Sequence, residues 1–143
     1  MSLLSSLRII GMIHFPPLLG SPDHPGIETI ESYMRADTKA LEEGGVDAIM
    51  LENNYDLPHT RLLSNGSRQD MRNLCHTARS LTALPLGICC LWNDWKSALD
   101  IALECNLQFI RIPVFVDHIA THYNYEIEED PEEITAYRSQ IGG

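Results

Sequence analysis

Three side chains of kinds that enzymes use for acid–base and anion chemistry lie in or directly after short apolar runs: His14, Glu52 and Arg111. A carboxylate such as Glu52, held away from water beside Arg111, would act as a general base or accept a hydrogen bond from a ligand hydroxyl. The planar guanidinium of Arg111 would hold a phosphate or carboxylate, and His14 would carry a proton or bind a metal. We therefore take these three as candidate catalytic residues. The alternatives are a structural Glu52–Arg111 ion pair and a loop-capping hydrogen bond from His14.

Four further polar residues follow the same apolar runs and are candidate ligand-binding residues: Asn53, Asp56, Asn93 and Asp94. The two asparagine amides would fix sugar hydroxyls, and Asp56 with Glu52 would hold magnesium beside a phosphate. Asp94 stands just before a helical pattern, so the favoured interpretation of this residue is a helix N-cap.

A metal site is not predicted. His118 and His122 are four residues apart beside Asp117, which would place both rings on one face of a helix. No third ligand is specified, and the favoured interpretation is an exposed polar loop. The sequence has no P-loop, dinucleotide fingerprint, nucleophile elbow or zinc-ligand series, so it indicates no particular cofactor.

The elements that must position these residues alternate between short apolar runs and amphipathic segments. The runs predict four strands, and helical spacing predicts a helix after each strand. In chain order these are Arg8–His14, Glu28–Glu43, Val46–Leu51, Asp70–Leu81, Pro85–Trp92, Trp95–Cys105, Leu107–Phe115 and Asp130–Ile141. Continuous apolar strands joined by helices predict a parallel sheet in an α/β fold, either an open doubly wound sheet or half of an eightfold barrel. Ligands meet such sheets at the carboxyl ends of the strands, where the candidate residues stand.

Length, charge and cysteine content narrow the class of protein. The chain has 143 residues, which predicts one domain over residues 1–143. The net charge of −10 disfavours nucleic acid and anionic lipid surfaces as partners. No apolar stretch is long enough to span a membrane, and Met1–Arg8 does not resemble a signal peptide. We expect a cytoplasmic protein whose four cysteines stay reduced.

Several segments, in order, resemble the motifs of the BtpA family (also called BtpA/SgcQ). They are Ile10–Pro22, Glu43–Asn53 with Asp56 and Pro58, Pro85–Gly87 with Leu91–Asp94, Phe109–Ile112, and Tyr137-Arg138. Several motifs in register are more specific than any one alone. The resemblance implies a TIM-type barrel of the ribulose-phosphate-binding group. It also implies a link to photosystem I biogenesis in cyanobacteria and to sugar-metabolism genes in other members.

The chain departs from the family pattern in two places. It holds four βα units where the family has eight, so the loops after strands seven and eight, the usual phosphate site of such barrels, are missing. Residues 116–125 match the family's Gly- and Asp-containing loop only loosely. We therefore expect a parallel (β/α)4 half of a TIM barrel, incomplete by itself. Its partners would be a small-molecule ligand and either a second copy or a missing C-terminal half.

Three functions remain open at this point. The first is a barrel that binds or processes a small phosphorylated or sugar-like ligand, which the polar side chains at the strand ends support. The second is a non-catalytic assembly or stability factor, as in photosystem I biogenesis, which the lack of a recognisable catalytic set supports. The third is an inactive fragment. Whether the protein is an enzyme is not decided by the sequence.

Overall fold

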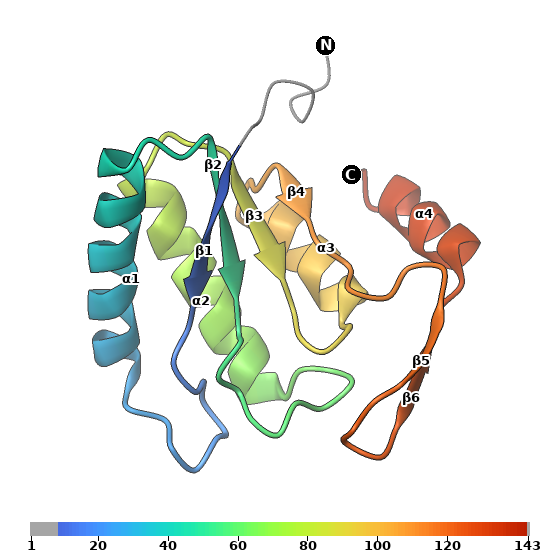
Figure 1. Ribbon diagram of the computed structural model, residues 1–143. Coiled ribbons are helices and arrows are strands. Elements are labelled where there is room, and N and C mark those ends of the chain that lie inside the picture. The colour runs from blue at the N-terminus through green and yellow to red at the C-terminus, as the bar shows by residue number, and fades with distance from the viewer. Residues whose placement is uncertain (1–8, 143) are drawn as a thin grey trace.

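The computed structural model describes residues 9–142, and it alternates strands with helices along the first four units (Figure 1). The elements are β1 (Ile10–His14), α1 (Ile27–Glu43), β2 (Ala48–Glu52), α2 (Asn65–Leu81), β3 (Leu86–Cys89), α3 (Trp95–Glu104), β4 (Phe109–Ile110), β5 (His118–Ala120), β6 (Glu126–Glu128) and α4 (Pro131–Gln140). Strands β1 to β4 pair in chain order and are all parallel. The predicted parallel α/β sheet is therefore confirmed. The expected strand start at Arg8, and the interpretation of Met1–Arg8, lie outside the described residues.

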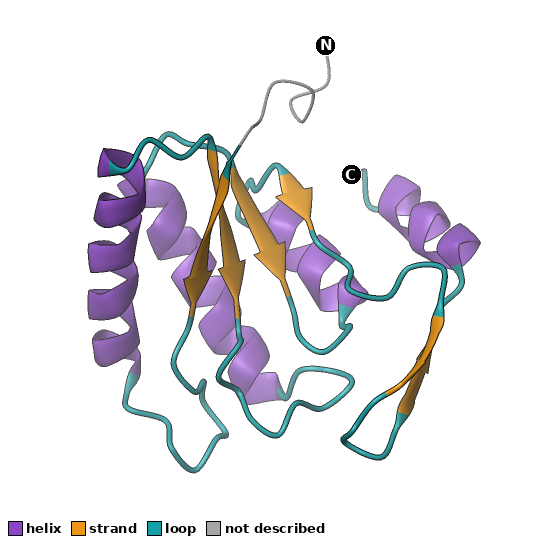
Figure 2. Ribbon diagram, viewed as in Figure 1, coloured by secondary structure: helices purple, strands orange, loops and turns teal. Residues whose placement is uncertain are grey.

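One face of the sheet forms the main core with α1, α2 and α3. Alternate side chains of the strands, including Ile13, Ile49 and Ile88, are buried against Met34 of α1 and Leu74 of α2. Figures 1 and 2 show these helices beside and behind the sheet, with no helix in front of it. Side chains at the other positions of the same strands therefore line a face that no described helix covers.

The helix ends follow local capping chemistry. Asp94 caps α3 by accepting the N–H of Ser97, and Asp130 caps α4, whose first residue is Pro131. The Asp94 cap agrees with the prediction, and Pro131 suits the first position of a helix because that position needs no N–H donor. Helix α1 ends at Glu43, as predicted, and Gly44 and Gly45 follow it; Gly45 takes a positive φ of 77° that glycine adopts without strain.

Helix α2 starts five residues before the predicted boundary at Asp70. Ser64 accepts the backbone N–H of Ser67 and so supports an extra first turn made of polar residues. That turn has no apolar periodicity, and for this reason the sequence pattern did not reveal it.

The fourth strand is shorter than the predicted Leu107–Phe115. It comprises Phe109–Ile110, after which the chain leaves the sheet near Pro113, a residue without an N–H to donate. The segment that follows was expected to be an exposed polar loop. Instead, β5 and β6 form an antiparallel hairpin, and His118, exposed on β5, lies 3.0 Å from Glu126 of β6. His118 and His122 therefore do not share a helix face, and the helical metal-site alternative is wrong.

Within residues 9–142, every helix is too short or too polar to cross a membrane. The four cysteines are free and buried.

Candidate functional site

The three candidate catalytic residues meet at the carboxyl edge of the sheet. Glu52 ends β2 and is 3% exposed, and its two carboxylate oxygens contact different charged or titratable side chains. Oε2 lies 3.1 Å from Nε2 of His14, which ends the neighbouring strand β1. Oε1 accepts a hydrogen bond of 3.0 Å from Nη1 of Arg111, directly after β4. The structure therefore brings His14, Glu52 and Arg111 together.

The exposure of the three side chains is unequal. The carboxylate of Glu52 is buried, whereas the side chains of His14 and Arg111 are 38% and 49% exposed. The bond to Glu52 uses one of the five N–H donors of Arg111, so a half-exposed guanidinium presents further donors toward the uncovered face. A negative ligand approaching from that face would meet a cation anchored by a buried carboxylate.

Cys89 is a fourth member of this cluster, which the sequence analysis included only among the four cysteines expected to stay reduced. It lies opposite Glu52 in the β2–β3 register and is fully buried. Burial first, then the charge of Glu52 and a hydrogen bond with it, raises the pKa of the Cys89 thiol far above its ordinary range. The thiol therefore stays protonated and supports the Glu52 carboxylate rather than acting as a nucleophile.

Asn53 and Asn93 are buried, and their amides are bonded to the backbone of loops at this edge. Asn53 accepts from the N–H of Leu91 at 2.6 Å and donates to the Leu91 carbonyl at 3.1 Å. Asn93 makes the same pair of bonds with Val114, at 2.8 and 3.0 Å. Each asparagine thus fixes the loop that follows the next strand, β3 for Asn53 and β4 for Asn93, and so positions the site.

The two aspartates also bond to backbone groups near the site. Asp94 accepts from Ser97 as the cap of α3 and from the N–H of Leu63 at 3.0 Å, so the N-cap interpretation is confirmed. Asp56 is half-buried and accepts from the N–H of Leu18 at 3.3 Å, which joins the loop after β2 to the loop after β1.

The hairpin docks on the loop after β2 through residues that the sequence analysis did not single out. Tyr125 donates to the carbonyl of His59 at 3.0 Å, and the ring of Tyr123 packs edge-on against the imidazole of His59. Burial lowers the pKa of His59 from its ordinary value, against the opposing charges of Asp56 and Glu52. No local pattern marks His59, because its partners lie more than sixty residues away.

Glu129 holds the base of the hairpin. Its buried carboxylate accepts from Trp95 at 2.8 Å, and from Arg61 and Asn93 at 3.2 Å each. In the sequence this residue belongs to an acidic run, and such runs usually face solvent. The three partners are what allow this one carboxylate to be buried.

The side chains of the cluster are of kinds that bind anions and hydroxyl groups in proteins. The cluster offers a guanidinium, an imidazole and a carboxylate, which suit a phosphate or carboxylate beside a hydroxyl. Across residues 9–142, His, Cys, Asp and Glu side chains form no group of three that would hold a metal ion.

Four parallel βα units with polar side chains gathered at the carboxyl edge define a parallel α/β protein, and this arrangement is consistent with part of a (β/α) barrel, in which ligands meet that edge. The chain belongs to the BtpA family, whose sequence profile matches residues 6–143.

Three relatives illustrate this membership. An uncharacterized protein of Pyrococcus furiosus is 32% identical over 97% of this chain and 53% of its own length. An uncharacterized protein of Archaeoglobus fulgidus is 35% identical over 73% of this chain and 42% of its own. The photosystem I biogenesis protein BtpA of Synechocystis is 31% identical over 93% of this chain and 47% of its own length. The chain thus spans about half the length of these relatives.

Proposed function

We propose that the protein binds a small phosphorylated or sugar-like ligand at the carboxyl edge of its sheet. The single observation that carries this proposal is the buried Glu52 carboxylate held between His14 and Arg111, both of which remain partly exposed. Arg111 would receive the phosphate or another anionic group of the ligand. Glu52, 3.0 Å from that guanidinium, would accept a hydroxyl proton of the same ligand or act as the base.

The candidate ligand-binding residues take different parts in this proposal. The amides of Asn53 and Asn93 are bonded to backbone, so they hold the loops in place and the ligand meets those loops. Asp94 likewise has a structural role, because it caps the start of α3. Asp56, half-buried on the loop after β2, is the member of this set best placed to meet a ligand hydroxyl.

The proposal is tested by titrating the protein with inorganic phosphate and with a pentose phosphate. Binding is measured in each titration from the NMR signals of the backbone amides. Arg111→Gln should weaken phosphate binding about 10- to 100-fold, the value of one lost hydrogen bond to a charged group. Arg35→Gln is the matched control, because Arg35 is similarly exposed and pairs with Glu31 on α1, away from the site. Unchanged binding in Arg111→Gln, or no binding by the unaltered chain, would overturn the proposal.

Glu52→Gln separates binding from chemistry. It keeps the shape of the side chain and removes its charge, so phosphate should still bind while proton transfer from a sugar ligand should stop. Exchange of a ligand C–H proton with deuterated water, followed by NMR, measures that step.

A role in photosystem assembly is the second candidate function, because the Synechocystis relative bears that name and matches 93% of this chain. On that hypothesis the edge cluster is a structural ion pair. A folded protein that binds neither phosphate nor a phosphosugar would favour it.

Localisation in the cytoplasm and reduced cysteines are part of the same proposal. Free, buried thiols fit a reducing compartment.

A further inference from the structure

The β5–β6 hairpin meets the loop after β2 at His59, a residue that is 7% exposed. The phenol of Tyr125 donates to the backbone carbonyl of His59 at 3.0 Å. The ring of Tyr123 packs against the His59 imidazole, with the ring centres 5.9 Å apart and the ring planes at 85°. Figure 1 shows this loop extending from the end of β2 toward the hairpin. The part of the hairpin near its turn is therefore held at His59.

This contact lies near the candidate site. Glu52 directly precedes the loop, and its charge acts on the His59 ring, as does the charge of Asp56. On the other side, the chain runs from Arg111 at the end of β4 into the hairpin. The loop and the hairpin together therefore border the carboxyl edge at which Glu52 and Arg111 stand.

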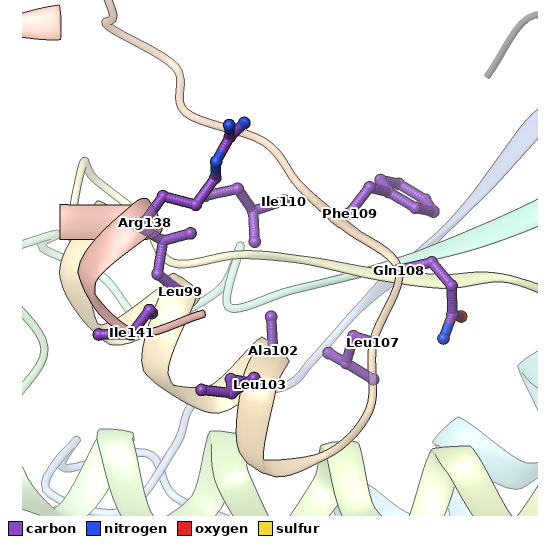
Figure 3. Close-up of a pocket in the computed structure, with 9 residues that line it drawn as sticks. All are labelled: Leu99, Ala102, Leu103, Leu107, Gln108, Phe109, Ile110, Arg138 and Ile141. Carbon is purple, nitrogen blue, oxygen red and sulfur yellow. The ribbon is translucent and has the colours of Figure 1, made fainter. Parts of the chain in front are cut away.

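The hairpin is loosely packed on the rest of the protein. Within residues 117–128, Ile127 is the only buried residue. Helix α4, which follows the hairpin, leaves an apolar pocket of about 410 Å³ against α3 and β4, lined in part by Leu103, Ile110 and Ile141 (Figure 3). Segments with few buried apolar contacts open at a low cost in free energy while the rest of a protein stays folded. The hairpin can therefore move without unfolding of the sheet.

The surroundings of the His59 ring suit a neutral imidazole. Its Nδ1 atom is buried and has no hydrogen-bond partner within residues 9–142. Protonation would give both ring nitrogens an N–H and add a positive charge. Burial opposes that charge and lowers the pKa of His59, although the charges of Asp56 and Glu52 and two backbone carbonyls of the loop favour it. Movement of the hairpin away from His59 would admit water to the ring and remove this opposition.

The hairpin brings its own titratable groups to this contact. The ring of His122 lies 3.9 Å from that of Tyr123, and His118 pairs with Glu126 at 3.0 Å across the hairpin. Both histidines are exposed, so their protonation does not conflict with the docked position of the hairpin. The phenols of Tyr123 and Tyr125 carry no charge near neutral pH. His59 is thus the group at this contact whose protonation opposes docking.

We infer that His59 is a positioning residue for the ligand site, which holds the hairpin on the loop after β2 while its ring is neutral and releases the hairpin when protonated. The inference rests on the proposed function in one respect, because the docked state is taken as the state that binds the ligand. Release takes up one proton, so the ratio of released to docked hairpin should rise up to about tenfold per pH unit below the midpoint. Ligand affinity should fall with the docked fraction.

The test is NMR of the protein without phosphate, from about pH 8 to about pH 5. A nuclear Overhauser effect between the rings of Tyr123 and His59, and the amide shifts of residues 121–125, report docking. Both should change at one midpoint below 6.5, while the amide signals of β2 and β3 remain those of a folded sheet. His59→Phe keeps an aromatic ring that cannot be protonated, so its hairpin should stay docked throughout. His122→Gln and His118→Gln are the matched controls and should keep the transition.

Two further measurements separate charge from acid damage and docking from binding. His59→Lys carries a charge at neutral pH, so its hairpin amides should show the released state at about pH 8. The affinity of the unaltered protein for a pentose phosphate, divided by that of His59→Phe, should be constant above the midpoint. Below it the ratio should fall by up to about tenfold per pH unit. Titration of the phosphate and of His14 is common to both proteins and cancels in this ratio.

Three results would overturn the inference: a transition that persists in His59→Phe, a docked hairpin in His59→Lys, or an affinity ratio that does not change with pH. Docking is measured without ligand, whereas Arg111→Gln tests phosphate binding at a pH where the hairpin is docked. Failure of the ligand proposal is therefore seen independently of failure of the His59 contact.

Discussion

Replacing Arg111 by glutamine distinguishes a ligand site from a structural ion pair. The lost contact is one hydrogen bond of 3.0 Å to a carboxylate, and such bonds contribute about 1.5–3 kcal/mol to stability. Arg111 is half-exposed, so solvent screens the interaction toward the 0–1 kcal/mol of surface pairs. His14 continues to contact the buried carboxylate after the change. We therefore expect the free energy of unfolding to fall by about 1–2 kcal/mol, with most of the effect appearing in phosphate binding.

Urea unfolding followed by circular dichroism measures the loss, beside phosphate titrations of the same samples. The control Arg35→Gln removes an exposed pair within α1 and should cost about 0.3–0.5 kcal/mol. A loss of about 3–5 kcal/mol with unchanged phosphate affinity would identify a buried structural pair and refute the site.

Three further predictions concern the supporting structure, each measured by urea unfolding. Asn93→Ala removes both bonds to Val114 and leaves buried polar groups unpaired, so unfolding free energy should fall by about 2–4 kcal/mol. Burial raises the pKa of the Cys105 thiol from 9.0 to about 11. Between pH 9.0 and about 11 the unfolded chain therefore releases a proton that the folded protein keeps. The free energy of unfolding should fall as pH rises through this range, and it should fall less in Cys105→Ala. Burial lowers the pKa of His59 below 6.5, so as pH falls this histidine is protonated in the unfolded chain before it is protonated in the folded protein. Stability should therefore fall as pH drops below 6.5, and His59→Phe should lessen that fall.

The meeting of His14, Glu52 and Arg111 was predictable because it depends on topology alone. His14 and Glu52 stand at or just after the end of an apolar run, and parallel strands bring such ends to one edge. Arg111 lies inside the predicted run Leu107–Phe115, and it reaches the same edge because β4 ends at Ile110. The sequence pattern could not decide how exposed each partner would be, since exposure depends on what the rest of the chain places above the edge. The structure gives unequal exposure: a buried carboxylate with two half-exposed partners.

The supporting network was not predictable from local pattern. Asn53 and Asn93 have the same residue type and the same position after a strand as a ligand-binding amide would have. Their partners Leu91 and Val114 lie 38 and 21 residues away, and only the folded chain shows that both amide ends are used. The hairpin was missed for a related reason, because β5 and β6 have three residues each and too few alternating positions to indicate strands.

The polarity of the uncovered face changes along the strands, and this change bears on the ligand proposal. At the carboxyl edge, neighbouring strands contribute His14, Glu52 and Cys89 in one register, with Arg111 following β4. Below that row the face is apolar. A ligand anion that competes for Arg111 would weaken the support of the buried Glu52 charge, which the contacts with His14 and Cys89 would then carry.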